Sequence, residues 1–88
     1  MAMIHLTVVT PEGMPYDADA QRIVARTSTG DVCILPRHID YAAALGTGEA
    51  RITTPDGEVR RAEISGGMLH VAADVVRVIT NTFRWKEA

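Results

Sequence analysis

The sequence predicts an all-β sandwich or barrel of about eight to ten short strands. Apolar and polar side chains alternate along most of the 88 residues, which is the period of a half-buried strand. Turn signals rich in Gly, Pro and Asp recur about every ten residues, the spacing typical of small β proteins. No stretch keeps the helical period long enough to predict a stable helix.

In the first half of the chain, Pro and Gly mark where the expected strands stop. The opening run is apolar on both faces, as in a strand buried between two layers, and Pro11-Glu12-Gly13 ends it with a turn. The short piece after that turn is expected to be an edge strand, because Pro15 is tolerated at sheet edges. Ser28-Thr29-Gly30-Asp31 reads as a turn, and Pro36 stops the run that follows it. The strands are expected at residues 3–9, 14–16, 20–27 and 32–35.

The second half contains two clear hairpin patterns. Tyr41 to Leu45 is rich in Ala and favours a helical turn by propensity, but five residues are too few for a stable helix. Gly46-Thr47-Gly48 is expected to break the chain. Pro55-Asp56-Gly57 and Ser65-Gly66-Gly67 are expected turns, with Gly57, Gly66 and Gly67 as their structural glycines. Strands are expected at residues 49–54, 58–64, 68–72 and 75–80, and residues 81–88 as a tail of one domain spanning 1–88.

Composition argues against several classes of partner and compartment, while it leaves open a local charged patch. The net charge is −2, so no excess of Lys or Arg marks a nucleic-acid or anionic-lipid surface. A single cysteine rules out a disulfide within the chain. The N-terminus lacks the features of a signal peptide, and no apolar run reaches the roughly 20 residues that span a bilayer. We expect a cytoplasmic protein that meets membranes only through a protein partner.

The chemically versatile side chains do not form a recognisable catalytic or metal-binding pattern. His5, His38 and His70 lie in separate strands or loops, without the convergent spacing that a zinc site needs, so we expect no metal and no cofactor. Cys33 lies in an apolar run and is expected to be an inert small hydrophobe. A thiolate–imidazole dyad of Cys33 with His38 is the enzymatic alternative, and a depressed thiol pKa would support it.

The segment from Gly30 to Asp40 is the most distinctive part of the chain. It places Asp31, Arg37, His38 and Asp40 at the ends of a short apolar strand. Pro36 has a fixed φ and stiffens the following loop, so that little entropy is lost when the loop docks on a partner. The segment is either such a contact element or an ordinary solvated loop.

This segment resembles the epsilon subunit of F-type ATP synthases, called delta in mitochondria. That family typically reads Gly-Glu-Leu-Gly-Ile-Leu-Pro-Gly-His-Ala-Pro-Leu-Leu here. The matching residues are Gly30, Ile34, Leu35, Pro36 and His38, with Asp31 in place of the Glu. Two later blocks also match, Ser65-Gly66-Gly67-Met68-Leu69-His70-Val71 and Val76-Arg77-Val78-Ile79, and so does the opening Met1 to Val9. The resemblance is collinear over residues 3–82.

The sequence departs from the family pattern in the loop and at the end. Cys33 and Arg37 replace family glycines, and Asp40 replaces a proline. The loop from Leu35 to Asp40 is similar to that of the alternate, sodium-type bacterial F-ATPases. Typical epsilon subunits continue into a helical hairpin of some 45 residues, whereas this sequence ends at Ala88, as a naturally short epsilon chain or as the N-terminal part of a longer one. Inhibition and ATP binding by the hairpin are therefore not carried over.

The resemblance implies a sandwich of two roughly five-stranded, mainly antiparallel sheets with about ten strands. It also implies a non-catalytic rotor subunit in the central stalk, peripheral on the cytoplasmic face of the cell membrane, that couples rotation of the c-ring to the gamma subunit. By position, the gamma contacts would be Thr10, Arg37, His38 and Asp40. The c-ring contacts would be Thr29, Gly30 and Asp31.

A stand-alone binding module, such as an OB-like barrel for oligonucleotides, is the main alternative. The net charge disfavours it, and so does the small number of aromatic side chains available for base stacking: Tyr16, Tyr41, Phe83 and Trp85. Salt-dependent binding of single-stranded DNA would support this alternative.

Overall fold

The structure, a computed structural model, describes residues 2–86 and consists of β-strands joined by short turns. The strands are β1 (Ile4–Thr10), β2 (Gly13–Ala20), β3 (Arg22–Thr27), β4 (Gly30–Ile34), β5 (Tyr41–Thr53), β6 (Val59–Ser65), β7 (Met68–Ala72), β8 (Val75–Ile79) and β9 (Thr82–Trp85). The expected all-β class is confirmed.

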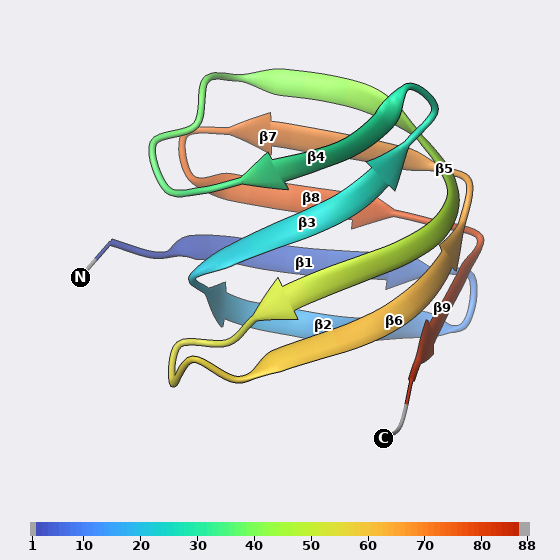
Figure 1. Ribbon diagram of the computed structural model, residues 1–88, viewed down its shortest axis with the longest axis horizontal. Helices are drawn as coiled ribbons and strands as arrows, with labels where there is room; N and C mark the ends of the chain where they lie inside the picture. Colours follow the sequence, from blue (N-terminus) through green and yellow to red (C-terminus); the bar gives the residue numbers. More distant parts are fainter. Residues whose placement is uncertain (1, 87–88) are drawn as a thin grey trace.

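The strands form two layers that share the long strand β5 (Figure 1). We call the layer with the order β2-β1-β8-β7-β5 sheet 1 and the layer with the order β4-β3-β5-β6-β9 sheet 2. Each layer has five strands because β5 contributes to both. Every pair is antiparallel except β1 with β8, which is parallel.

The expected break at Gly46-Thr47-Gly48 is wrong, because β5 runs through it without interruption. Tyr41 to Ala44 pairs with β7 in sheet 1, and the strand from Leu45 onward pairs with β3 and β6 in sheet 2. The expected helical turn at the start of this segment is also absent. Gly46 and Gly48 lie where β5 bends against β3: a Cβ at either position would come within 3.0 Å of the backbone of Thr27 or the side chain of Arg26. These glycines permit close approach of two strands rather than a turn.

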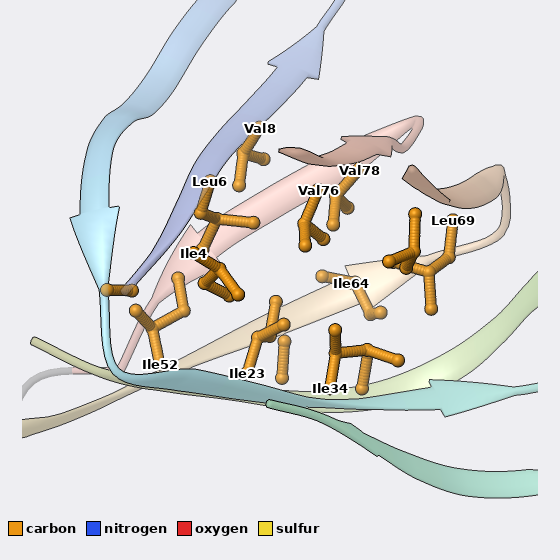
Figure 2. Packing of buried hydrophobic residues seen from close by; sticks show 14 of the residues in the cluster. Ile4, Leu6, Val8, Ile23, Ile34, Ile52, Ile64, Leu69, Val76 and Val78 are labelled. Carbon is orange, nitrogen blue, oxygen red and sulfur yellow. The ribbon is translucent and has the colours of Figure 1, made fainter. Parts of the chain in front are cut away.

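The core lies between the two sheets. Side chains at alternate strand positions point inward from both layers and interdigitate (Figure 2). Sheet 1 contributes Ile4, Leu6, Val8, Leu69, Val71, Val76 and Val78; sheet 2 contributes chiefly Ile23, Ile34, Ile52 and Ile64. Each fully buried aliphatic side chain contributes about 1.5–3 kcal/mol relative to an exposed one, so this cluster is the main source of stability.

Two other expectations also differ from the structure. The first strand was expected to be buried on both faces, but β1 is buried on one face only: Leu6 is buried, whereas its neighbour His5 is exposed. The other face of β1 is the outer surface of sheet 1, with no further layer over it among the described residues. Within the segment expected to be a tail, Thr82 to Trp85 forms β9 and pairs with β6, because Phe83 and Trp85 pack against the edge of the core.

The expected turn glycines occupy turns that favour them. Gly57 lies in the β5–β6 hairpin with φ 92°. Gly66 and Gly67, with φ 68° and 110°, carry the chain from sheet 2 back to sheet 1. A Cβ on Gly67 would overlap the carbonyl oxygen of Ile79, so only glycine fits at this position. Residues 2–86 contain no helix with the length and apolar character to cross a membrane.

Candidate protein-contact surfaces

The loop between β4 and β5 is tied to the turn between β7 and β8. The backbone N–H of Arg37 donates to Oδ1 of Asp74 at 2.6 Å, and the N–H of Ala73 donates to Oδ1 of Asp40 at 3.4 Å. Arg37, Ala73 and Asp74 all have positive φ, between 49° and 65°. Consecutive positive φ at both turn residues is the geometry of a tight type I′ hairpin. The loop is therefore held by cross-links in addition to the stiffness of Pro36.

This loop presents both charged and apolar side chains to solvent. Leu35 and Ile39 are 48% and 76% exposed, and Ile39 is the most exposed large apolar side chain among the described residues. Arg37 and Asp40 are also exposed. The half-buried ring of His38 packs edge-on against Tyr41, with ring centroids 5.8 Å apart, and its Nδ1 lies 2.8 Å from the carbonyl oxygen of Ile39. An apolar side chain surrounded by polar ones is the usual composition of a protein-contact site.

The turn between β3 and β4 carries the three residues expected to contact the c-ring. Thr29, Gly30 and Asp31 are exposed. The hydroxyl of Thr27 donates to the carbonyl oxygen of Gly30 at 2.6 Å and fixes the turn. Nε of Arg26 lies 2.7 Å from Oδ1 of Asp31, and this carboxylate raises the pKa of Arg26 above its ordinary value. Asp31 therefore presents a carboxylate that is already partly neutralised.

These two elements lie at opposite ends of the sandwich (Figure 1). We call the end with the β4–β5 loop the Asp74 end, where the N–H of His5 donates to the carbonyl oxygen of Asp74. We call the opposite end the Gly66 end. There the N–H of Ser28 donates to the carbonyl oxygen of Ala44, and the N–H of Gly66 donates to that of Gly46. The five-residue β4 joins the two elements, so the two sets are separated by about 15 Å.

Thr10 does not join the other three residues expected to contact gamma. It ends β1 at the Gly66 end, next to Val9, whose carbonyl oxygen accepts from the N–H of Thr80. Thr10 lines a surface hollow there together with Met14 and Phe83. The structure thus brings together Arg37, His38 and Asp40, and places Thr10 on the side of the expected c-ring contacts.

A polar cluster that the sequence analysis did not single out lies on the outer face of sheet 1. Nε2 of His5 is 2.9 Å from Oδ1 of Asp17, and Nδ1 is 3.2 Å from Oδ1 of Asp19. Hydrogen bonds to these carboxylates raise the pKa of His5, and the bond to Asp17 has the larger effect. The signal in the sequence was the alternation of Asp17 and Asp19 along an edge strand, but only the β1–β2 register shows that both face His5.

The described residues do not form the geometry that either alternative function, an enzyme or an oligonucleotide-binding module, would need. In residues 2–86 no group of three His, Cys, Asp or Glu side chains converges to hold a metal ion. Cys33 is exposed on β4 rather than packed as a small hydrophobe, and no hydrogen bond in the described part of the chain joins it to His38. The aromatic rings of Tyr16, Phe83 and Trp85 pack edge-on against one another at the core and so do not form an open stacking platform.

Comparisons with known proteins agree on one family. The sequence profile described as "ATP synthase, Delta/Epsilon chain, beta-sandwich domain" matches residues 3–86. The chain is 38% identical over 88 residues to the ATP synthase epsilon chain of Ruminococcus albus, covering 99% of this chain and 65% of that protein. It is 44% identical over 84 residues to the ATP synthase epsilon chain of Thioalkalivibrio sulfidiphilus, covering 93% of this chain and 60% of that protein.

One similar solved structure is a chain of a mitochondrial ATP synthase assembly. A chain in the cryo-EM structure of the Euglena gracilis mitochondrial ATP synthase, OSCP/F1/c-ring in rotational state 1, superimposes with a TM-score of 0.91 at 25% sequence identity. The match covers 97% of this chain and 54% of that one. This chain spans less than two thirds of the length of each of these three relatives.

Proposed function

The chain belongs to the family of ATP synthase delta/epsilon β-sandwich domains, and from this premise we propose that it is a non-catalytic rotor subunit of an F1Fo ATP synthase. In this role it couples rotation of the c-ring to the gamma subunit during ATP synthesis. The observation that carries the proposal is the match of the family profile to residues 3–86, nearly the whole chain. The superposition on a chain from an F1/c-ring assembly supports it.

The proposed contacts with gamma include the β4–β5 loop at the Asp74 end, through Arg37, His38 and Asp40. The loop is suited to this role because its hydrogen bonds to Ala73 and Asp74 fix its backbone before docking. Exposed Ile39 supplies an apolar anchor next to the charges, which set register and orientation. A contact of gamma with Thr10 as well requires an elongated partner that spans the sandwich from end to end.

The proposed contact with the c-ring is the β3–β4 turn, through Thr29, Gly30 and Asp31. All three are exposed at the Gly66 end, and β4 separates them from the β4–β5 loop by about 15 Å. Contacts at two opposite ends allow one rigid sandwich to transmit torque between two partners. The chain would then be peripheral, on the cytoplasmic face of the membrane, and held there by the c-ring.

Co-purification with the gamma subunit from the same genome tests this proposal. We expect a stoichiometric complex with the wild-type chain, weakened by Arg37→Glu and by His38→Ala. Arg77→Glu, the same charge change on the outer face of sheet 1, is the matched control and should leave the complex intact. A complex indifferent to the loop variants would contradict the contact assignment alone, whereas no complex with a folded gamma would contradict the rotor function.

A further inference from the structure

The outer face of sheet 2 is strongly basic although the chain as a whole is acidic. Side chains there alternate with the buried ones along each strand, so they point away from the core. The charged members are Arg22, Arg26, Arg51, Arg61, Arg84 and Lys86, with Asp31, Glu49 and Glu63. Within residues 2–86 this face therefore carries a net charge of +3, whereas the whole chain carries −2.

Three of these cations form a row across adjacent strands, which we call the basic row: Arg51 on β5, Arg61 on β6 and Lys86 after β9. Arg51 lies directly opposite Arg61 in the β5–β6 register. The N–H of Lys86 donates to the carbonyl oxygen of Arg61 at 2.9 Å, which places Lys86 on the far side of Arg61. β5, β6 and β9 lie side by side (Figure 1). Their spacing puts the Cβ atoms of successive members of the row about 5 Å apart.

One carboxylate, that of Glu49, pairs with two of the three cations. Nζ of Lys86 lies 3.0 Å from Oε2 of Glu49, and Nε of Arg51 lies 3.9 Å from Oε1 of the same side chain. The hydrogen bond from Lys86, with the nearby charges of Arg61 and Arg51, lowers the pKa of Glu49. Within residues 2–86, Arg61 makes no ion pair of its own. The basic row therefore carries more positive charge than the surrounding side chains neutralise.

Like charges directly opposite each other in a sheet are destabilising. A row of three such cations on an open face is thus a site that an anionic partner would stabilise. Arginine favours carboxylate or phosphate partners in particular, because its planar guanidinium can bind two oxygens at once.

The next row across the same strands distinguishes the classes of anionic partner. There Glu49 lies directly opposite Glu63 and Glu63 opposite Arg84, so this row, parallel to the basic row, holds two carboxylates and one cation. A lipid surface is uniformly negative and would meet these two carboxylates together with the cations. It would also gain little from insertion, because among the described residues of this face Val59 is the one large apolar side chain that is half exposed. A protein segment, in contrast, can align its acidic groups with the basic row alone.

We propose that the basic row binds an acidic α-helix of a partner protein, which lies across β5, β6 and β9. Helix side chains three or four residues apart are about 5–6 Å from one another, close to the spacing of the basic row. Asp or Glu at such positions meets Arg51, Arg61 and Lys86 in turn. This interface is separate from the loops assigned to gamma and the c-ring, and the inference does not depend on the rotor function.

The test is a titration of the full chain, followed by NMR, with a helical alanine-based peptide of about 20 residues that carries Glu at every fourth position. An isomer of the same composition, with its Glu residues on different faces, is the control ligand, and vesicles of phosphatidylcholine with phosphatidylglycerol are the control surface. We expect amide shifts in β5, β6 and β9. Arg61→Glu should raise the Kd at least about tenfold, whereas Arg77→Glu should change it by less than about twofold. Arg61→Gln should also raise the Kd, and it provides the same test if Arg61→Glu fails to fold.

Three results would overturn the proposal. Equal binding of the isomeric peptide would show attraction by charge alone. If Arg61→Glu and Arg77→Glu weakened peptide binding equally, the basic row would not be the binding site. Binding of vesicles without binding of the peptide at millimolar concentration would identify a lipid surface instead.

Discussion

Gly67 is the residue at which the chain re-enters sheet 1 from sheet 2, and its replacement by alanine tests how strictly this crossover requires glycine. Gly57 is the matched control, because it also has positive φ but has open space where a Cβ would lie. Gly57→Ala therefore introduces backbone strain alone, which costs about 1–3 kcal/mol. Gly67→Ala introduces a similar strain and in addition drives its Cβ into the carbonyl oxygen of Ile79.

Relief of that overlap must move the backbone of the crossover. The hydrogen bonds at risk are those from Leu45 N–H to the oxygen of Gly67, at 2.9 Å, and from the Thr80 hydroxyl to the oxygen of Gly66, at 2.8 Å. Each contributes about 1 kcal/mol, so the total cost of Gly67→Ala is about 3–5 kcal/mol. A domain of this size has a free energy of unfolding of about 4–13 kcal/mol. Gly67→Ala should lower Tm by about 12–40 °C.

Urea denaturation followed by the fluorescence of Trp85, the single tryptophan, measures both variants. We expect Gly67→Ala to be destabilised by at least about 1 kcal/mol more than Gly57→Ala, with an unchanged slope on denaturant. Equal destabilisation of the two would refute the steric reasoning, because it would mean that the crossover accommodates a Cβ at no further cost.

Two other perturbations test local features of the fold. His5 is stabilised in its protonated form by Asp17 and Asp19, so its contribution to stability is fully present below its ordinary pKa of 6.5 and is lost as pH rises through the raised pKa. NMR titration should show a lower pKa of His5 in Asp17→Asn but no change in Glu63→Gln, a distant variant of equal charge; an unchanged pKa in Asp17→Asn would contradict the assigned cause. Asp74→Ala removes the acceptor of the Arg37 N–H and should speed tryptic cleavage after Arg37, whereas Asp74→Asn keeps an acceptor oxygen, tolerates positive φ and should be cleaved at the wild-type rate. Equal cleavage rates in both variants would mean that this hydrogen bond does not hold the loop.

Local pattern was sufficient for most strands, and it failed where tertiary packing decided the outcome. The hairpin at Pro55-Asp56-Gly57 was predictable because turn chemistry acts within a few residues. Gly46 and Gly48 carry the same local signal for a break, yet they serve a close approach to β3 that depends on strands distant in sequence. β9 was missed as a strand although Phe83 and Trp85 alternate with Arg84, because a four-residue run has little weight until its partner is known.

The candidate contact residues divide in the same way. The motif around Pro36 was visible in the sequence, but its anchoring by Asp74 depends on the β7–β8 turn, 37 residues along the chain. Thr10 could be proposed as a gamma contact only by its position in the family pattern, because no local signal indicates that it lies at the end opposite Arg37. The basic row could not be seen before the register was known, since Arg51 and Arg61 become neighbours only through the β5–β6 pairing.

The proposed function makes this chain part of the rotor between gamma and the c-ring. The most direct measurement is to purify the F1Fo ATP synthase from the cell that encodes this chain, through a tag on a different subunit, and to quantify the chain relative to gamma by mass spectrometry. The rotor account predicts that the chain is present in amounts equal to gamma and stays with it when the c-ring is detached. An intact ATP synthase that contains gamma and the c-ring but lacks this chain would contradict it.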